Sequence, residues 1–595
     1  MTPLPSPSRV TAIRRFVWLG IACSGILAIA AFTSYWFHNR WHRVEYSQLT
    51  DFADSASAPS LSADGRMLTF LSGGDFFLSS NQIYVKMLPS GEAKRLTDDL
   101  QWKYNPVFSP DGSEIAYTVV DGTIFDTKVV PVFGGESRLL LKNAAGLTWL
   151  SADEVLFSRV PSGLHMGVVR GKLITQQFRD LYYPAKEEEM AHFSFASPDR
   201  SVAVVVQMDE EGLWTQCRLI SLNNRFSWRF VGPEGSCNAA AWSPDGFWMY
   251  FTVAKGGKSH LWRQRYPNGT PEQISFGPAE EHGLSMEPDG HSVVTSFGLR
   301  QTTLWLHQPT GDRALVMEGE PLGAEFEEAI YPPSFSADSS SIYYLTRRAR
   351  DLEPELSRID VKSGNSEVLL PGVFMHDYDI SANGKRVLYS CNSTAGARNL
   401  CVASIRRDFA PYRISVPGAM FPRFGTPGKI FFYRMEGNSR YLEEINEDGS
   451  GRQKLLPSPV FDDVRFSPSR RWLFTAFGTK GSDVQFKAVS LQGDSAKTYC
   501  STPCYPYWSP DGKWFYVPVE HATINSAGRC LAIPIGPNET LPEFPAGRIK
   551  PGAEPSVIPG SVSINREWVI PGIDPTEYAY LSVKTQRNLY RITLP

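Results

Sequence analysis

A short turn motif recurs along almost the whole chain and constrains its fold more than any other feature. One clear copy is Trp508-Ser509-Pro510-Asp511-Gly512, which lies between two apolar, aromatic-rich runs. An Asp-Gly pair in this setting is a strong hairpin signal, because glycine adopts positive φ without steric cost and aspartate hydrogen-bonds the nearby backbone. Clear and degenerate copies are centred near residues 64, 111, 153, 199, 245, 289, 338, 383, 428, 469, 511 and 575.

The spacing of these turns predicts the architecture. Nearly all steps between them are 41 to 49 residues long, and only the last is longer. A period of roughly 40–45 residues with four short strands per unit is typical of propeller blades. In one unit, for example, the apolar pattern predicts strands at 239–243, 248–253, 259–265 and 272–275. About twelve units in register disfavour the alternative, unrelated hairpins in a β-sandwich.

Twelve units exceed the four to eight blades that one propeller usually has. We therefore predict an all-β fold of two tandem β-propellers, each with about six four-stranded blades. One predicted transmembrane helix precedes the two propellers. The acidic stretch 319–328, which contains proline and glycine, marks the break between them. The predicted parts are a tail at 1–15, a transmembrane helix at 16–37, a linker with a closing strand at 38–56, a first propeller at 57–320 and a second propeller at 321–595.

The repeat resembles the TolB-type β-propeller repeat, a relative of the Trp-Asp repeat propellers, over about residues 44–595. The run 578–592 is also similar to the end of the propeller ectodomains of bacterial membrane sensor proteins. Those chains carry a cytoplasmic kinase or a winged-helix domain before their membrane helix, whereas only 15 residues precede the helix predicted here. We therefore expect no kinase or DNA-binding output of its own. The resemblance identifies a blade and not a function.

An N-terminal membrane anchor is the second strong feature. Residues 16–37 form a run of 22 residues without a charge, which is long enough to cross a hydrocarbon core of about 30 Å as a helix. Aromatic residues at both ends suit the membrane interfaces. We favour an uncleaved anchor over the alternative, a cleaved signal peptide. Three arginines before the run, against two shortly after it, favour a cytoplasmic N-terminus. Together with the TolB resemblance, this predicts a bacterial inner-membrane protein with its propellers in the periplasm.

The two ends of the chain complement each other. Residues 44–50 look like an outer strand that comes before any innermost strand. At the other end, 568–572, 578–583 and 588–594 supply the first three strands of a final blade. We expect the N-terminal strand to complete this final blade, which would remove exposed strand edges. The alternative is that it completes the first propeller instead.

Cysteine usage is compatible with an oxidising compartment. Cys391 ends one predicted strand and Cys401 begins the next, so they are candidates for a disulfide across that hairpin. Further candidates are Cys217 with Cys237, and two of Cys500, Cys504 and Cys530. Reduced, buried cysteines are the alternative. A Cys-x3-Cys pair without histidine partners does not indicate zinc.

Candidate binding residues lie just before the innermost strands, in loops that converge at the mouth of the central channel, where propellers bind partners. Aromatic side chains together with arginine and histidine suit a protein or peptide interface. Packing or solvated loop residues are the alternative for each position. The candidates are Trp102, Tyr104, Glu281, His282, Tyr331, His376, Asp377, Arg423, Asp462, Asp463, Tyr505 and Tyr507.

Catalytic signatures are missing from the sequence. No Gly-x-Ser-x-Gly elbow, His-Glu-x-x-His pair or phosphate-binding loop occurs, so we expect no enzyme activity, metal or cofactor. A net charge of -3 without a clustered Lys/Arg face argues against nucleic acid. We expect a membrane-anchored periplasmic scaffold that binds an envelope protein or peptide; its oligomeric state is undefined by the sequence. The alternatives are a ligand-sensing ectodomain that signals through a partner, and a propeller enzyme with a site at the channel mouth.

Overall fold

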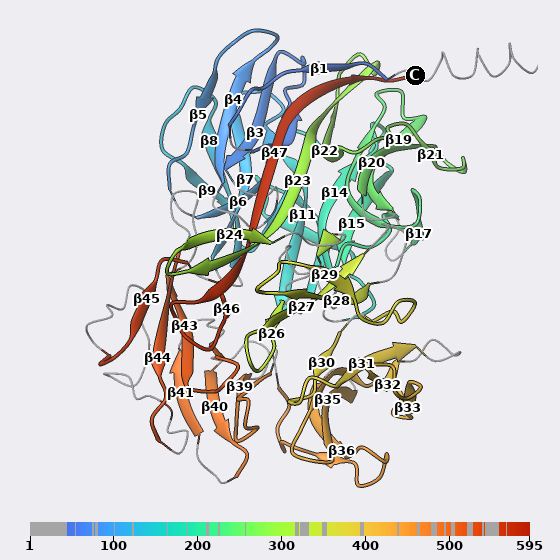
Figure 1. Ribbon diagram of the computed structural model, residues 1–595. Coiled ribbons are helices and arrows are strands. Elements are labelled where there is room, and N and C mark those ends of the chain that lie inside the picture. Colours follow the sequence, from blue (N-terminus) through green and yellow to red (C-terminus); the bar gives the residue numbers. More distant parts are fainter. Residues whose placement is uncertain are drawn as a thin grey trace, which may run out of the picture.

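The computed structural model describes residues 44–53, 55–73, 77, 81–99, 101–121, 124–162, 165–186, 189–209, 213–223, 227–255, 258–315, 320–321, 333–347, 354–375, 377–392, 398–436, 439–460, 464–477, 485–492, 496–500, 506–520, 528–537, 541, 558–566 and 568–595. Within these residues every named regular element is a β-strand. The all-β prediction is therefore confirmed for the described part of the chain. The strands form antiparallel, mostly four-stranded sheets that follow one another along the sequence (Figure 1).

Five of these sheets form an N-terminal group. A single parallel bridge between Met166 and Met190 connects the third sheet to the fourth. The strands are β2 (Ser55–Leu61), β3 (Met67–Gly73), β4 (Gln82–Met87) and β5 (Ala93–Arg95); β6 (Trp102–Phe108), β7 (Glu114–Asp121), β8 (Ile124–Pro131) and β9 (Arg138–Leu141); β10 (Ala145–Trp149), β11 (Glu154–Ser162), β12 (His165–Lys172) and β13 (Gln177–Tyr182); β14 (Met190–Ala196), β15 (Val202–Met208), β16 (Arg218–Ser221) and β17 (Trp228–Phe230); and β18 (Ser236–Trp242), β19 (Trp248–Lys255), β20 (Lys258–Arg265) and β21 (Glu272–Gln273).

Five further sheets form a C-terminal group. An additional strand, β25 (Glu320–Pro321), pairs with the second strand of the first of them. The strands are β26 (Ser334–Phe335), β27 (Ser341–Arg347), β28 (Glu355–Asp360) and β29 (Ser366–Val368); β30 (Asp379–Ile380), β31 (Arg386–Asn392), β32 (Arg398–Ser404) and β33 (Tyr412–Ile414); β34 (Met420–Phe424), β35 (Lys429–Glu436), β36 (Ser439–Asn446) and β37 (Gln453–Lys454); β38 (Arg465–Phe466), β39 (Trp472–Phe477), β40 (Gln485–Ser490) and β41 (Ala496–Cys500); and β42 (Tyr507–Trp508), β43 (Trp514–Glu520), β44 (Arg529–Pro534) and β45 (Val562–Ile564).

Each group is completed by one half of a shared sheet. This sheet contains β1 (Tyr46–Gln48), β22 (Glu280–Met286), β23 (Ser292–Gln308), β24 (Gly311–Leu315), β46 (Ile570–Pro571) and β47 (Tyr578–Thr593). The first strands of the N-terminal group contact one another in a closed cycle, β2–β6–β10–β14–β18–β22 and back to β2. Four-stranded sheets arranged radially around such a cycle are a β-propeller. In the C-terminal group, first strands likewise contact one another in the pairs β26–β46, β30–β34 and β38–β42.

The recurring turn is held by its own side chains. In one copy the Ser109 hydroxyl donates to Asp111 Oδ1 at 2.6 Å, and the Glu114 N–H donates to Ser109 Oγ at 3.0 Å. Gly112 adopts a φ of 71°, and its N–H donates to the Ser109 carbonyl. Glycine takes this left-handed conformation without the steric cost that a Cβ imposes. The Ser-to-Asp or Ser-to-Asn bond recurs in the turns at 62–64, 197–199, 243–245, 336–338, 381–383 and 509–511.

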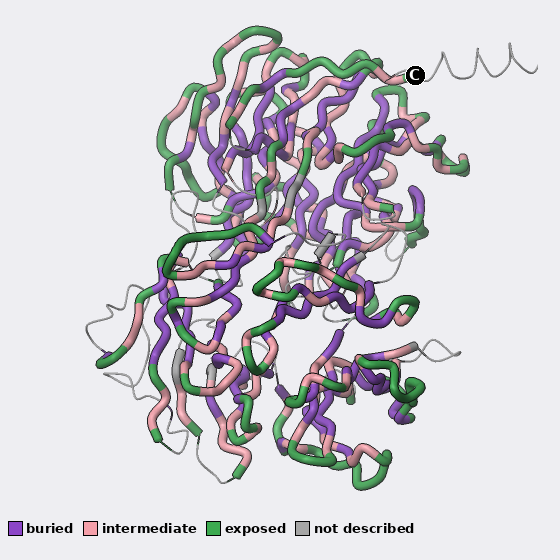
Figure 2. The backbone as a smooth tube through the Cα atoms, in the orientation of Figure 1, coloured by how far each residue is buried: buried purple, intermediate pink, exposed green. Residues whose placement is uncertain are grey.

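Apolar side chains fill the space between neighbouring sheets. The second strands are almost completely buried; Leu68, Phe70 and Leu71 of β3, for example, expose none of their surface. Figure 2 shows that buried residues follow the strands, whereas exposed residues gather at turns and outer strands. Burial on both faces explains the continuous apolar runs in these strands, because each sheet is covered by a neighbour on either side.

Two long strands tie the groups together. β23 and β47 pair along their whole length, from Ser292 with Thr593 to His307 with Tyr578 (Figure 1). The first half of β23 pairs with β22, and its second half pairs with β24. The first half of β47 pairs with β46, and its second half pairs with β1. Each long strand is therefore the second strand of one group and the third strand of the other.

This pairing corrects the prediction for the chain ends. The predicted strands 578–583 and 588–594 are one continuous strand, β47, so they are not successive strands of one blade. The N-terminal strand β1 pairs with the end of β47, in the half-sheet that begins with β22. It thus completes the N-terminal group, which was the alternative. Local patterns could not reveal this, because a long strand and two short strands have the same apolar alternation.

The predicted membrane helix, 16–37, lies outside the described residues. Among the residues that are described, no helix is long and apolar enough to span a membrane.

Candidate functional site

The shared strands define two sides of each group. β23 passes from one group to the other near residues 298–302. Up to this point β23 is the second strand of a sheet in the N-terminal group, and beyond it β23 is the third strand of a sheet in the C-terminal group. The turns between second and third strands therefore lie on this side in both groups. First strands also begin here, because neighbouring strands are antiparallel. We call this the junction side, and the opposite side, which carries the Asp-Gly turns, the outer side.

The predicted binding residues are found mainly on the junction side. Seven of them are described: Trp102 and Tyr104 on β6, Glu281 and His282 on β22, Asp377 just before β30, Arg423 on β34 and Tyr507 at the start of β42. Trp102 is 39% exposed, whereas Tyr104 and Glu281 are fully buried. Tyr331, His376, Asp462, Asp463 and Tyr505 lie outside the described residues.

Tyr104 belongs to an aromatic cluster on the axis of the N-terminal group. The Phe77 ring lies 5.0 Å from the Tyr104 ring, 4.9 Å from the His192 ring and 5.2 Å from the Trp214 ring. Phe77 follows β3 of the first sheet, and His192 lies on β14 of the fourth sheet. These sheets are opposite each other in a cycle of six, so the rings span the axis and fill it on the junction side.

His192 is the unusual member of this cluster. Its imidazole is buried, and within the described residues neither ring nitrogen has a hydrogen-bond partner. Burial lowers the pKa of His192 to about 3. The ring is therefore neutral at physiological pH and packs as an aromatic side chain, with Trp214 at 5.5 Å.

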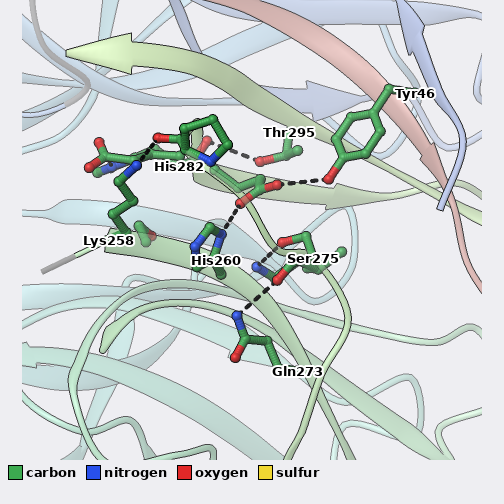
Figure 3. A network of polar contacts seen from close by, with 12 residues as sticks. Tyr46, Lys258, His260, Gln273, Ser275, His282 and Thr295 are labelled. Atoms are coloured by element: carbon green, nitrogen blue, oxygen red, sulfur yellow. Dashed lines mark hydrogen bonds and ion pairs between the residues drawn. The ribbon is translucent and has the colours of Figure 1, made fainter. Parts of the chain in front are cut away.

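Glu281 is the centre of a polar cluster between the fifth sheet and the closing half-sheet (Figure 3). Tyr46 Oη donates to Glu281 Oε1 at 3.0 Å, and His260 Nδ1 lies 3.0 Å from Glu281 Oε2. The Glu281 side chain is 0% exposed and the His260 side chain 11%. Burial, and next the Glu281 charge, raise the pKa of Tyr46, so its phenol stays protonated and donates. β1, β20 and β22 thus meet at one buried carboxylate.

A second carboxylate extends the cluster. Arg587 Nη2 donates to Glu280 Oε2 at 2.6 Å, and His282 Nε2 lies 3.6 Å from the same oxygen. On its other side, His282 Nδ1 is 3.5 Å from Asn238 Nδ2. Arg587 comes from β47 and Asn238 from β18, so the two chain ends and the fifth sheet all contribute. This arrangement can hold the closing strands in place, and it orients two imidazoles at the junction side.

The described candidates of the C-terminal group are engaged with the backbone. Asp377 is buried, and it accepts hydrogen bonds from the Ser390 N–H and hydroxyl, both at 2.5 Å, and from the Phe421 N–H at 3.2 Å. Arg423 Nη1 donates to the Tyr378 carbonyl at 3.3 Å. Tyr507 Oη accepts from the Val569 N–H at 3.2 Å. These contacts tie three first strands to neighbouring strands, and Arg423 and Tyr507 lie near the outer-side turns rather than on the junction side.

Two disulfides lie within the described residues. Cys217 is bonded to Cys237 and Cys391 to Cys401. The first connects the fourth sheet to the fifth, and the second crosses the hairpin of β31 and β32. Cys530 is buried, with its Sγ 3.7 Å from Tyr507 Oη. Cys504 and the side chain of Cys500 lie outside the described part. No group of three or more His, Cys, Asp or Glu residues that could hold a metal is found among the residues described.

Sequence reasoning missed five residues of the polar cluster: Tyr46, Asn238, His260, Glu280 and Arg587. His260 was not among the predicted residues, because its partner, Glu281, lies on the next sheet. A usable signal did exist: the third strand of one blade packs beside the first strand of the next, and β20 contacts β22 in this way. Arg587 could not be found by this route, because its partner depends on the exchange of β23 and β47.

No known protein-family model and no curated protein sequence matches this chain. Similar solved structures include the tricorn protease, with 13% identity and a TM-score of 0.33, covering 87% of this chain and 54% of that chain. A TolB structure from Agrobacterium tumefaciens has 16% identity and a TM-score of 0.25, covering 55% of this chain and 87% of that one. A GH74 enzyme from Niastella koreensis has 13% identity and a TM-score of 0.33, with 90% of both chains covered.

These similarities are too weak to support an argument about function. The fold is defined instead by the sheet order and by the closed cycle of first strands, which make the chain a β-propeller protein.

Proposed function

We propose that this chain is a membrane-anchored periplasmic scaffold of two six-bladed β-propellers that binds an envelope protein or peptide on its junction side. The observation that carries the proposal is the exchange of β23 and β47. Because β23 changes its role at residues 298–302 and β47 changes its role at the paired residues 583–587, the junction sides of both groups meet the same crossing point. A partner bound there can reach candidate residues of both propellers.

The chemistry of the junction side suits a protein partner. Trp102 is partly exposed there, and His282 and Glu280 are partly exposed on β22, which is separated from the sheet of Trp102 by the sheet that begins with β2. Aromatic side chains flanked by charged groups are the usual anchors of protein interfaces. The filled axis of the N-terminal group favours binding across the rim rather than insertion into the channel.

The periplasmic location is supported by the two disulfides, since structural disulfides persist in oxidising compartments and are rare in the cytosol. The anchor is the uncharged run 16–37.

Photocrosslinking in living cells tests this function. A photoreactive amino acid is placed at Trp102 or at His282 in the full-length chain, and adducts are identified by mass spectrometry. Phe247 is the matched control, because it is an exposed aromatic residue on the outer side. We expect the same envelope protein or peptide to be attached at 102 and 282 and not at 247. The proposal is refuted when neither junction-side position gives an adduct.

A second candidate is hydrolysis at the polar cluster. Its basis is the pair of His260 and Glu281, since a buried carboxylate that orients an imidazole is the arrangement of a general base. Purified full-length protein would then hydrolyse chromogenic esters or glycosides, and Glu281→Gln would reduce the rate at least tenfold. If the unmodified protein hydrolyses these substrates no faster than buffer alone, this candidate function is rejected.

A further inference from the structure

The N-terminal end of the described chain emerges on the outer side of the N-terminal group. Tyr46 pairs with Ile592, and the Thr593 N–H donates to the Glu45 carbonyl at 3.1 Å. Next to them, the Leu594 N–H donates to the carbonyl of His291, in the turn between β22 and β23. β1 therefore begins at an outer-side turn. Figure 1 shows β1 and the C-terminus at the top of the molecule, far from β36 and β40 of the C-terminal group.

Large apolar side chains are exposed at turn tips on the same side. Phe133 is 83% exposed and Ile174 is 82% exposed. They lie in the turns between the third and fourth strands of the second and third sheets. Met87, at the end of β4 in the first sheet, is 51% exposed. Single exposed apolar residues are normal, but clusters of them mark interaction surfaces. These three residues lie on consecutive sheets that follow the closing half-sheet, so they form an arc next to the start of β1.

Charge separates this arc from the centre of the outer side. Lys94 Nζ donates to the Phe133 carbonyl at 2.6 Å, which places an ammonium group beside the most exposed apolar side chain. The Asp-Gly turns lie nearer the axis, and hydrogen bonds from Ser109 and Ser113 lower the pKa of Asp111. Carboxylates therefore surround the axis, while the rim carries the apolar side chains together with charges of both signs, Lys94 and the exposed Glu92 and Glu136.

We propose that this arc, formed by Met87, Phe133, Ile174 and Lys94, rests on the surface of the lipid bilayer that holds the anchor. The inference depends on the membrane anchor of the proposed function and adds the face that meets the membrane. Only residues 38–43 separate the predicted helix from Val44. Six extended residues reach about 20 Å at most, so the outer side is held close to the headgroups. Exposed aromatic and aliphatic side chains with a nearby lysine bind such an interface.

Lipid photolabelling of the full-length chain in proteoliposomes tests the proposal. The vesicles contain phosphatidylethanolamine, phosphatidylglycerol and a phospholipid with a photoreactive headgroup. After irradiation, tryptic peptides are analysed by mass spectrometry. Cleavage after Lys128 separates peptide 129–138, which contains Phe133, from peptide 104–128, which contains Ile124. Ile124 is 56% exposed but lies on the junction side, and thus serves as an internal control.

We expect label in peptides 129–138 and 173–179 at a level at least fivefold above that in 104–128. The double variant Phe133→Ser/Ile174→Ser should lose most of this label, whereas the junction-side variant Ile124→Ser/Phe276→Ser should keep it. Labelling of peptide 104–128 that equals or exceeds that of peptides 129–138 and 173–179 overturns the inference. This holds even when the protein floats with the vesicles, a result that by itself supports the anchor. Protein that does not float with the vesicles overturns both the anchor and this inference. Label that survives in the Phe133→Ser/Ile174→Ser variant also overturns it.

Discussion

At the scale of single residues, the recurring turn is stabilised by a serine whose hydroxyl makes two hydrogen bonds, one as donor and one as acceptor. The Ser109 hydroxyl donates to Asp111 and at the same time accepts from the Glu114 N–H. Serine is therefore needed as both donor and acceptor, and its replacement leaves a backbone N–H at the base of the hairpin without its partner. The same pair of contacts occurs at Ser509, where the Trp514 N–H donates to the hydroxyl.

The first prediction concerns this serine. Ser109→Ala should lower the free energy of unfolding by about 1–3 kcal/mol, because it leaves a partly buried backbone donor, the Glu114 N–H, unsatisfied. Ser113→Ala is the matched control: its hydroxyl also donates to Asp111, but from an exposed position. Exposed changes of this kind usually alter stability by less than about 0.5 kcal/mol. Urea unfolding measures both variants, and equal losses would contradict the assigned role of Ser109.

The second prediction concerns pH. Burial lowers the pKa of His192 to about 3 from its ordinary value of 6.5, so between these pH values the unfolded chain binds a proton that the folded chain does not. The neutral ring costs no stability above pH 6.5, and stability falls as the pH drops from 6.5 toward 3. His192→Phe should flatten this part of the pH dependence of unfolding. An unchanged slope in His192→Phe would count against the buried neutral ring.

At the scale of elements, the long strands β23 and β47 make each group depend on a segment from the other end of the chain. Leu589 is fully buried and packs with Leu49, Phe70 and Val294 of the N-terminal group. Leu304 is also fully buried, but packs with Phe335, Ile342 and Tyr344 of the C-terminal group. Leu589, near the C-terminus, thus belongs to the core of the N-terminal group, whereas Leu304, earlier in the sequence, belongs to the core of the C-terminal group.

The third prediction uses this reversal. Leu589→Ala should destabilise the N-terminal group and Leu304→Ala the C-terminal group, each by about 2–5 kcal/mol, as is typical for buried leucines. Hydrogen exchange resolved by peptide measures the two groups separately, and each variant is the control for the other. Faster exchange in the group nearest to the substitution in sequence would contradict the strand exchange.

These elements also show how much the sequence could predict. The turns and the strands around them are local patterns, and the strands predicted at 239–243, 248–253 and 259–265 agree with β18, β19 and β20 to within three residues. The starts of first strands follow only roughly from the same period: Glu281 and His282, expected just before a first strand, lie on β22 itself. Which strand pairs with which is not local, so the role of β47, and with it the contact of Arg587 with Glu280, could not be predicted.

At the scale of the whole molecule, the exchange of β23 and β47 gives the chain two distinct sides. The junction side carries the polar cluster around Glu281, and the outer side carries the exposed arc and the start of β1. A scaffold anchored at the outer side would present its junction side away from the bilayer surface on which the arc rests. The proposed partner site and the proposed membrane surface are therefore compatible, because they do not compete for the same residues.

Disulfide trapping along β23 and β47 tests the strand exchange most directly. Two cysteine pairs are introduced together, Ser292→Cys with Thr593→Cys in the N-terminal group, and Thr303→Cys with Ser582→Cys in the C-terminal group; both pairs face each other in the register. A control combines Thr303→Cys with Lys584→Cys, which is two residues out of register. We predict that both matched pairs form disulfides in the same molecule, as shown by mass spectrometry of linked peptides, and that the control does not. A molecule in which only one matched pair can form would contradict the account.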